Sequence, residues 1–164
     1  MASDGYNPAV PARIPAFAVL LGVAGLIPFV VLTFGAIGVN VALGERMLRW
    51  LVAYGAVILA FLGGVHWGFV LQPVPGAPAV NPRARLGFGV TPSLIGFVAL
   101  VVTPWIGLGV LIAGFIFTTI SEAEANRRGL LPPGYMLLRW ALTGVVVILL
   151  AVVMFLRAVG AHFG

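Results

Sequence analysis

The chain has 164 residues, of which 62% are hydrophobic and 8% are charged, and its formal net charge is +5. In a soluble domain about a quarter of all residues are charged, so this composition indicates an integral membrane protein. The nine basic residues are all arginines that lie singly or in pairs beside apolar runs, without the clustered basic face that nucleic-acid binding requires, so we expect no nucleic-acid partner.

The sequence predicts an all-α, polytopic membrane protein, because five apolar segments come close to the roughly 20 residues that one membrane crossing needs. We expect them to form one compact bundle of five transmembrane helices. In chain order, the predicted helices cover residues 14–37, 47–71, 82–102, 105–120 and 134–159. Pro28 in the first helix and Pro92 in the third are expected to kink them, since proline removes a backbone hydrogen bond.

The segments outside these helices have compositions that do not favour regular structure. Residues 1–13 are polar and rich in proline and alanine, which predicts a mobile N-terminal tail. Residues 72–81 combine several prolines with a glycine, a composition typical of an extended connection. Residues 14–164 are therefore predicted to form a single domain.

Arginine is more frequent on one side of the predicted bundle, with six residues against three on the other side. The positive-inside bias then places the N-terminus in the cytoplasm and the C-terminus on the opposite side of the membrane. We expect a multi-pass protein of the bacterial inner membrane, or of the mitochondrial inner membrane if the source is eukaryotic. The six arginines on the cytoplasmic side are Arg13, Arg83, Arg85, Arg127, Arg128 and Arg139.

Two patterns lie on the predicted helix 47–71. Small residues recur every four positions at Ala56, Ala60, Gly64 and Gly68, and such a stripe lets a neighbouring helix backbone approach closely. At 100° per residue, His66 lies roughly opposite Gly64 and Gly68. We expect the stripe to pack against another helix, with the helix over 105–120 as the closest neighbour, and the helix 47–71 to be central in the bundle.

His66 is an ionisable residue inside an otherwise uncharged apolar segment. A titratable group without a partner is costly in a bilayer, so it marks a candidate site. It lies roughly 7 Å from the cytoplasmic end of its helix, at 1.5 Å per residue, and Glu122 and Arg139 are expected at the same depth. We predict a polar or ligand-binding cluster of His66, Trp67, Glu122 and Arg139. A satisfied structural imidazole and a solvated helix end at Glu122 and Glu124 remain as alternatives.

Several chemistries lack the residue types that they need. Lysine and cysteine are absent, which excludes a Schiff-base cofactor, a P-loop lysine, disulfides and thiolate metal sites. Neither a Gly-x-Ser-x-Gly elbow nor a His-Glu-x-x-His helix is present. His66 and His162 are predicted at opposite ends of the bundle, so they cannot share one haem. We therefore expect no cofactor, no metal site and no enzymatic activity.

Four sequence blocks carry a resemblance to a known family. They are residues 21–29 (LGVAGLIPF), 54–68 (YGAVILAFLGGVHWG), 91–94 (TPSL) and 129–143 (GLLPPGYMLLRWALT). In this order they are similar to the bacterial membrane family called domain of unknown function 3429, which is related to the animal transmembrane protein 69. The resemblance implies a small membrane protein of five helices, and it implies no activity.

Two classes of function fit these observations. The first is an accessory or assembly subunit, which packs its glycine-lined helices against other membrane proteins or against a second copy of itself. The alternative is a carrier or binder of a small hydrophobic or protonatable ligand, such as a quinone or a lipid, in a cytoplasmic-side cavity around His66. The first class is favoured by the missing catalytic residues and by the small-residue stripe, and the second by the buried titratable group.

Overall fold

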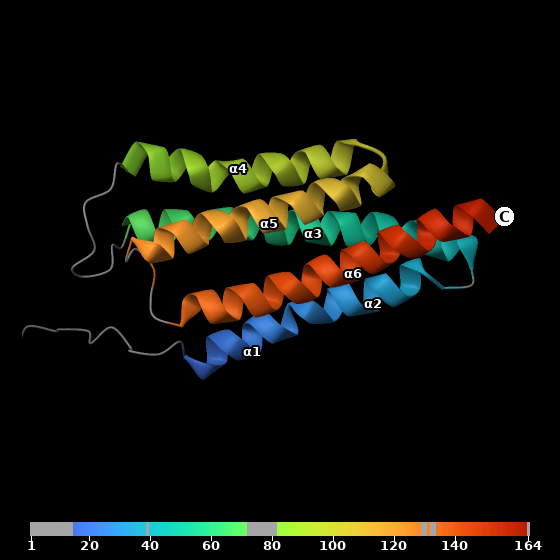
Figure 1. Ribbon diagram of the computed structural model, residues 1–164, viewed down its shortest axis with the longest axis horizontal. Coiled ribbons are helices and arrows are strands. Elements are labelled where there is room, and N and C mark those ends of the chain that lie inside the picture. The colour runs from blue at the N-terminus through green and yellow to red at the C-terminus, as the bar shows by residue number, and fades with distance from the viewer. Residues whose placement is uncertain (1–14, 39, 72–81, 129–130, 132–133, 164) are drawn as a thin grey trace, which may run out of the picture.

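The computed structural model describes residues 15–38, 40–71, 82–128, 131 and 134–163, and the regular elements in these residues are all helices. The predicted tail and the predicted loop over 72–81 lie outside the described residues. Successive helical rods run in alternating directions, so that α1 begins at one end of the bundle and α6 finishes at the other (Figure 1). The helices are α1 (Ala16–Ala24), α2 (Leu26–Ala36), α3 (Val41–Leu71), α4 (Pro82–Val101), α5 (Pro104–Arg127) and α6 (Tyr135–Phe163).

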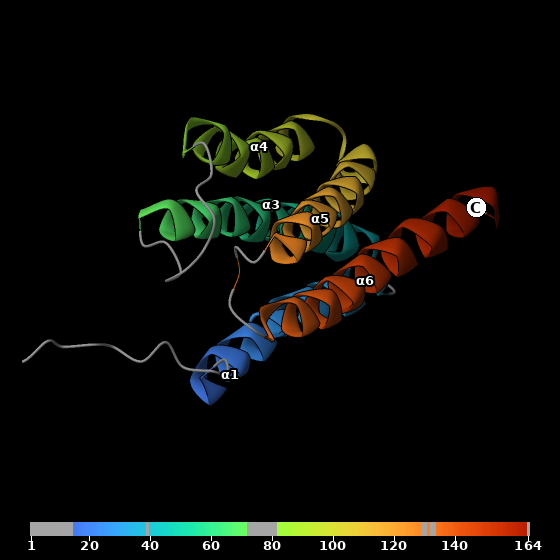
Figure 2. The same ribbon diagram turned by 60° about the vertical axis from the view of Figure 1, so that its left-hand side comes forward.

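The predicted all-α membrane bundle is confirmed. Four rods are long and apolar enough to cross a membrane, namely Ala16–Ala36, Val41–Gly68, Pro104–Arg127 and Tyr135–Gly160, and Arg85–Val101 is a shorter apolar helix. This shorter helix, within α4, lies beside α3 and α5, while α2 lies beside α3 and α6 (Figure 2). Large apolar side chains such as Phe61, which is 66% exposed, cover the outer surface. A membrane supplies the acyl chains that such a surface needs.

The first rod is interrupted at Gly25, which separates α1 from α2. The interruption lies three residues before Pro28, because the proline nitrogen cannot donate to the carbonyl of Ala24 and its ring crowds that carbonyl. The Tyr54 hydroxyl donates a hydrogen bond of 3.0 Å to the Gly25 carbonyl, and this hydrogen bond connects the interruption between α1 and α2 to α3. Around Pro92, in contrast, α4 continues without interruption.

The core lies where α2, α3, α5 and α6 meet. Phe29 of α2 packs edge-on against Tyr54 and against Phe115 of α5, with ring centroids 4.9 and 6.2 Å apart. Leucines from α3 and α5 and aliphatic residues from α6 complete the core, and the fully buried ones include Leu51, Leu59, Leu108, Leu111, Leu150 and Val153. Helix α3 is thus central in the bundle, as expected for the helix over 47–71.

The closest approach between helices joins α3 to α4. A Cβ placed on Gly63 would lie 2.2 Å from the Gly89 carbonyl oxygen, and one placed on Gly96 would lie 2.9 Å from the Ala56 carbonyl oxygen. Both distances are shorter than real Cβ contacts, so only glycine allows the two backbones to lie this close. The close neighbour of α3 is therefore α4, and the expectation that the helix over 105–120 would fill that place is corrected.

The small-residue stripe on α3 is also corrected. Ala56 is buried against α4, but Ala60 is only partly buried, and Gly64 and Gly68 are exposed with no atom within 4 Å of an added Cβ. The glycine at the helix contact is Gly63, one position earlier. Since one residue turns the helix by 100°, a stripe that begins at Ala56 with a period of four drifts away from α4 within three turns.

At the opposite end of the bundle, Arg157 of α6 joins the ends of three helices. Its Nη2 donates a hydrogen bond of 2.9 Å to the carbonyl of Ala36, where α2 ends, and its Nη1 pairs with Glu45 in the first turns of α3. Helix α3 begins six residues earlier than predicted, and it therefore includes Glu45. This contact satisfies a carbonyl at a helix end that has no partner within the helix.

Candidate functional site

Glu122 is fully buried, with 0% of its surface exposed. It lies inside α5, because this helix continues to Arg127, seven residues beyond its predicted end. The alternative of a solvated helix end is therefore wrong for Glu122. It describes Glu124 instead, whose half-exposed carboxylate pairs with Arg128 one turn later at 2.9 Å.

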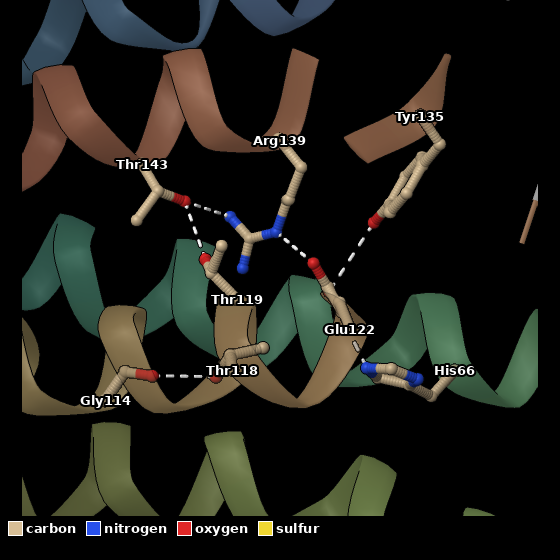
Figure 3. A network of polar contacts seen from close by, with 8 residues as sticks. All are labelled: His66, Gly114, Thr118, Thr119, Glu122, Tyr135, Arg139 and Thr143. Carbon is tan, nitrogen blue, oxygen red and sulfur yellow. Dashed lines mark hydrogen bonds and ion pairs between the residues drawn. The ribbon is translucent and has the colours of Figure 1, made fainter. Parts of the chain in front are cut away.

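Arg139 is the ionic partner of Glu122. Its Nε donates to Glu122 Oε2 at 2.5 Å, and its Nη1 donates to the Thr143 hydroxyl at 2.8 Å (Figure 3). The Thr143 hydroxyl is also hydrogen-bonded to the Thr119 hydroxyl at 2.9 Å. Arg139 is only 5% exposed, so both charges of this pair are removed from solvent. Buried charges persist in proteins when they are paired and hydrogen-bonded in this way.

His66 lies on the other side of Glu122. Its Nε2 is 3.6 Å from Glu122 Oε1, and its ring meets the ring of Phe88 edge-on at 5.2 Å. The Tyr135 hydroxyl donates to the same carboxylate oxygen at 3.5 Å. His66 is 3% exposed and Nε2 makes no hydrogen bond. Three helices, α3, α5 and α6, thus bring His66, Glu122 and Arg139 into one buried cluster, at the end of the bundle where α1 begins (Figures 1 and 3).

Trp67 does not belong to this cluster. It is 44% exposed, and its Nε1 donates a hydrogen bond of 3.2 Å to the Leu86 carbonyl of α4. Because consecutive helical residues are turned by 100° from one another, Trp67 leaves the buried face that His66 occupies. It holds α4 against α3 at the surface.

Three members of the polar cluster were not predicted, namely Thr119, Tyr135 and Thr143. The sequence did contain a signal for two of them, because Thr143 follows Arg139 by four positions and Thr119 precedes Glu122 by three. Residues at these spacings share one helical face. A buried arginine has five N–H donors to satisfy, so neighbouring hydroxyls on its face are expected partners. Thr118, in contrast, donates to the Gly114 carbonyl of its own helix.

A cavity of about 150 Å³ adjoins the cluster. Arg139 and Thr143 form the polar part of its wall, and the remaining lining side chains are apolar. Its rim includes Leu21 and Phe61, which are exposed on the outer surface of the bundle. His66, Trp67 and Glu122 do not line it. The apolar wall is formed by Leu21, Gly22, Gly25, Leu26, Phe29, Ile58, Phe61, Leu62, Phe115, Leu142 and Val146.

The hydrogen bonds around the buried guanidinium satisfy only part of its donors. Arg139 Nη2 is buried and has no hydrogen-bond partner, while Nε and Nη1 are both used (Figure 3). An unsatisfied buried donor costs about 1–3 kcal/mol, and more when it is charged.

The described residues hold no group of three or more His, Cys, Asp and Glu side chains that could bind a metal ion. His66 and Glu122 contribute two such ligands, and the third neighbour in the cluster is the cationic Arg139. A positive charge 2.5 Å from a carboxylate opposes cation binding there. The geometry thus places a buried ion pair beside an apolar cavity.

The fold and the cluster define a class: a small polytopic helical protein of the membrane, with a buried ion pair beside an apolar cavity. The chain belongs to the family described as Protein of unknown function (DUF3429), whose model matches residues 14–155. The predicted family resemblance is thereby confirmed.

Curated relatives carry the name Transmembrane protein 69. The protein from Xenopus tropicalis is 40% identical over 91 residues, which cover 52% of this chain and 33% of the relative. The protein from Mus musculus is 37% identical over 75 residues, which cover 40% of this chain and 30% of the relative. The matches thus span about a third of the length of these relatives. No solved structure matches the chain.

Proposed function

We propose that this membrane protein binds a small hydrophobic molecule, such as a quinone or a lipid, in the cavity beside the buried cluster of His66, Glu122 and Arg139. The observation that carries the proposal is an apolar cavity of about 150 Å³ whose wall includes Arg139 and Thr143 of the buried polar cluster. Binding sites for small molecules combine mostly apolar walls with a few placed polar groups, which is the composition of this wall.

The position of the cavity supports a ligand that arrives from the membrane. Leu21 and Phe61 at its rim lie on the outer, apolar surface of the bundle, where acyl chains are the solvent. The buried ion pair supports the same proposal, because intramembrane ionisable residues are costly and mark functional sites. The proposal includes no catalysed reaction, since Glu122, Arg139 and Thr143 are hydrogen-bonded to one another and none of them is an activated nucleophile.

Copurification tests the proposal. The full chain is purified in a mild detergent, and the small molecules extracted from it are identified by mass spectrometry. The test variant Ile58→Phe fills the cavity from its wall, and the control Val57→Phe adds the same ring one position away, on a side chain that is 62% exposed. We expect a hydrophobic molecule with the wild type and Val57→Phe and its loss with Ile58→Phe. A wild-type chain without any such molecule, or equal amounts in both variants, contradicts the proposal.

A second function, that of an accessory or assembly subunit, is favoured by one specific observation. Ala60, Gly64 and Gly68 form a row on α3 that points away from the rest of the bundle, and Gly64 and Gly68 meet no atom within 4 Å. Rows of small residues let helices of two chains pack closely in a membrane. A helix of another membrane protein, or of a second copy, fits this row. Chemical cross-linking in the membrane tests this second function. We expect the Gly64→Leu variant to lose its cross-linked partner while the monomer stays intact, and an unchanged cross-linking pattern contradicts the function.

We place this protein in the bacterial inner membrane, or in the mitochondrial inner membrane if the source is eukaryotic, with the cluster end facing the cytoplasm or the matrix. The support is the arginine distribution, because Arg83 and Arg85 at the start of α4, Arg127 at the end of α5 and its C-cap Arg128 lie at the end of the bundle where α1 begins. Cytoplasmic ends of membrane helices carry this excess of arginine.

A further inference from the structure

We infer that an anionic phospholipid binds on the outer face of α3, near the start of this helix, with its phosphate held by Arg46 and Arg49. This surface lies at the end of the bundle where α6 finishes, whereas the cavity beside Arg139 lies near the start of α6 (Figure 1). The inference is therefore independent of the proposed binding function of the cavity.

The two arginines carry positive charge that the described part of the chain does not neutralise. Arg46 and Arg49 are both exposed, and their spacing of three positions places them as neighbours on the surface of α3. Among the described residues, neither side chain forms an ion pair or a hydrogen bond. Glu45, the acidic residue beside them in the sequence, pairs with Arg157 instead. This surface therefore offers two positive charges to a partner outside the chain.

The depth of the two arginines matches that of lipid phosphates. Helix α3 has 31 residues and is about 46 Å long, which exceeds the roughly 30 Å of the hydrocarbon core, so its ends reach the head groups. Trp50, directly after Arg49, is 49% exposed. Helices α3 and α5 run in the same direction, and a Cβ on Gly107 would lie 3.1 Å from the Val52 side chain, so Trp105 lies level with Trp50. Exposed tryptophans at one level mark the membrane interface.

The charge of this surface selects the occupant. A guanidinium binds a phosphate through two parallel N–H···O hydrogen bonds, and the pair of charges attracts an anion. A neutral phospholipid brings its own cation next to its phosphate, so an anionic head group gains more from the two arginines. A second copy of the chain, packed on this face with its α3 parallel to the first, brings the same two arginines against them, and like charges repel.

The apolar part of the same face fits the acyl chains. At 100° per residue, Arg46, Trp50 and Val57 point within about 40° of one another. Val57 is 62% exposed and lies about 16 Å along the helix from Arg46, which is close to the thickness of one hydrocarbon leaflet. The acyl chains therefore contact α3 as far as Val57. They end before Gly64 and Gly68, the row that a protein helix fits.

Tryptophan fluorescence tests the inference in vesicles. The full chain is reconstituted into phosphatidylcholine vesicles that contain the same mole fraction of either brominated phosphatidylglycerol or brominated phosphatidylcholine, whose bromines quench tryptophan on contact. Each chain is measured with and without Trp50→Phe, and the difference is the signal of Trp50. We expect phosphatidylglycerol to bind beside Trp50 about fivefold more tightly than phosphatidylcholine at low salt, the factor for one arginine acting on an anionic lipid. High salt is expected to reduce this preference.

Two double variants with the same loss of charge locate the site. Arg46→Gln with Arg49→Gln is expected to bring the quenching by phosphatidylglycerol down to that by phosphatidylcholine. Arg127→Gln with Arg128→Gln is the matched control, because these exposed arginines lie at the other end of the bundle. It is expected to keep the wild-type preference at Trp50. All four substituted side chains are exposed, and circular dichroism checks that the helix content is unchanged.

Each remaining outcome overturns the inference. Equal quenching by the two brominated lipids in the wild type shows that the surface does not select an anionic head group. A preference that survives the loss of Arg46 and Arg49, or that disappears equally in the control, assigns the selectivity to the net charge of the chain. Quenching of Trp50 by neither lipid shows that a protein surface covers this face. The copurification result for the cavity is unaffected in every case.

Discussion

Two adjacent glycines of α3 are expected to respond in opposite ways to the same substitution. In Gly63→Ala, the new methyl group lies 2.2 Å from the Gly89 carbonyl oxygen and 3.4 Å from a ring carbon of Pro92. Both neighbours belong to α4, and the nearer one is backbone, which no rotamer change moves away. To reach even 3.0 Å, the shortest distance that real Cβ atoms show, the two helices must separate there by about 0.8 Å.

The magnitude follows from two opposing effects. Overpacking of a close interface costs about 1–3 kcal/mol, and the better helix propensity of alanine returns about 0.5–1 kcal/mol. Gly63→Ala is therefore expected to lower the free energy of unfolding by about 1–2 kcal/mol. Gly64→Ala has the same propensity gain and meets no atom within 4 Å, so it is expected to raise this free energy by about 0.5–1 kcal/mol.

Equilibrium unfolding in SDS, followed by circular dichroism, measures both values in one series with the wild type. The two variants share the residue type, the helix and nearly the same depth, so their difference isolates the contact with α4. A Gly63→Ala chain as stable as the wild type, or a Gly64→Ala chain that loses as much as Gly63→Ala, refutes the close approach of α3 and α4 at Gly89.

Three further outcomes are expected. Glu122→Gln is expected to lower the free energy of unfolding by about 3–5 kcal/mol, because it leaves the Arg139 charge buried without its partner. The control Glu124→Gln is expected to change this free energy by less than about 0.5 kcal/mol, because its ion pair is exposed. Unfolding in SDS compares the two variants, and equal effects contradict the burial of Glu122. Tyr54→Phe removes the hydroxyl that is hydrogen-bonded to the Gly25 carbonyl, and it is expected to lower the free energy of unfolding by about 1 kcal/mol. Amide hydrogen exchange around the interruption between α1 and α2 is expected to become faster, and unchanged exchange contradicts the role of this hydrogen bond. Reporter fusions to the two termini should report a cytoplasmic N-terminus and a C-terminus across the membrane, and signals from the same side disprove that orientation.

The number and order of the helical rods, with α1 and α2 counted as one interrupted rod, followed from the sequence because apolar length is a property of each segment by itself. The ends of the helices were less accurate. The predicted fourth helix stopped at residue 120, since Glu122 and Glu124 are polar and a hydropathy pattern treats both as solvated. Only the tertiary structure distinguishes them, because Arg139 reaches the first and Arg128 the second.

The candidate site, too, was predicted only in part. His66, Glu122 and Arg139 were predicted together from their depth in the membrane, and the structure brings them together. The cavity was predicted around His66, but it lies beside Arg139, because its wall depends on how α1, α2, α3, α5 and α6 pack together and His66 does not line it. The glycine at the helix contact was predicted as Gly64 and is Gly63 in the structure. A period of four positions identifies a row of small residues, but it does not determine which side of the helix another helix covers.

The ion pair between α5 and α6 has a consequence for how the protein is made. The carboxylate of Glu122 is synthesised before the guanidinium of Arg139, and the two lie on consecutive helices that must both enter the membrane. Inserted alone, α5 exposes an unpaired acidic group to lipid, which is costly. Inserted together as a hairpin, α5 and α6 arrive with their charges already neutralised. Biogenesis therefore favours the release of these last two helices into the bilayer as one unit.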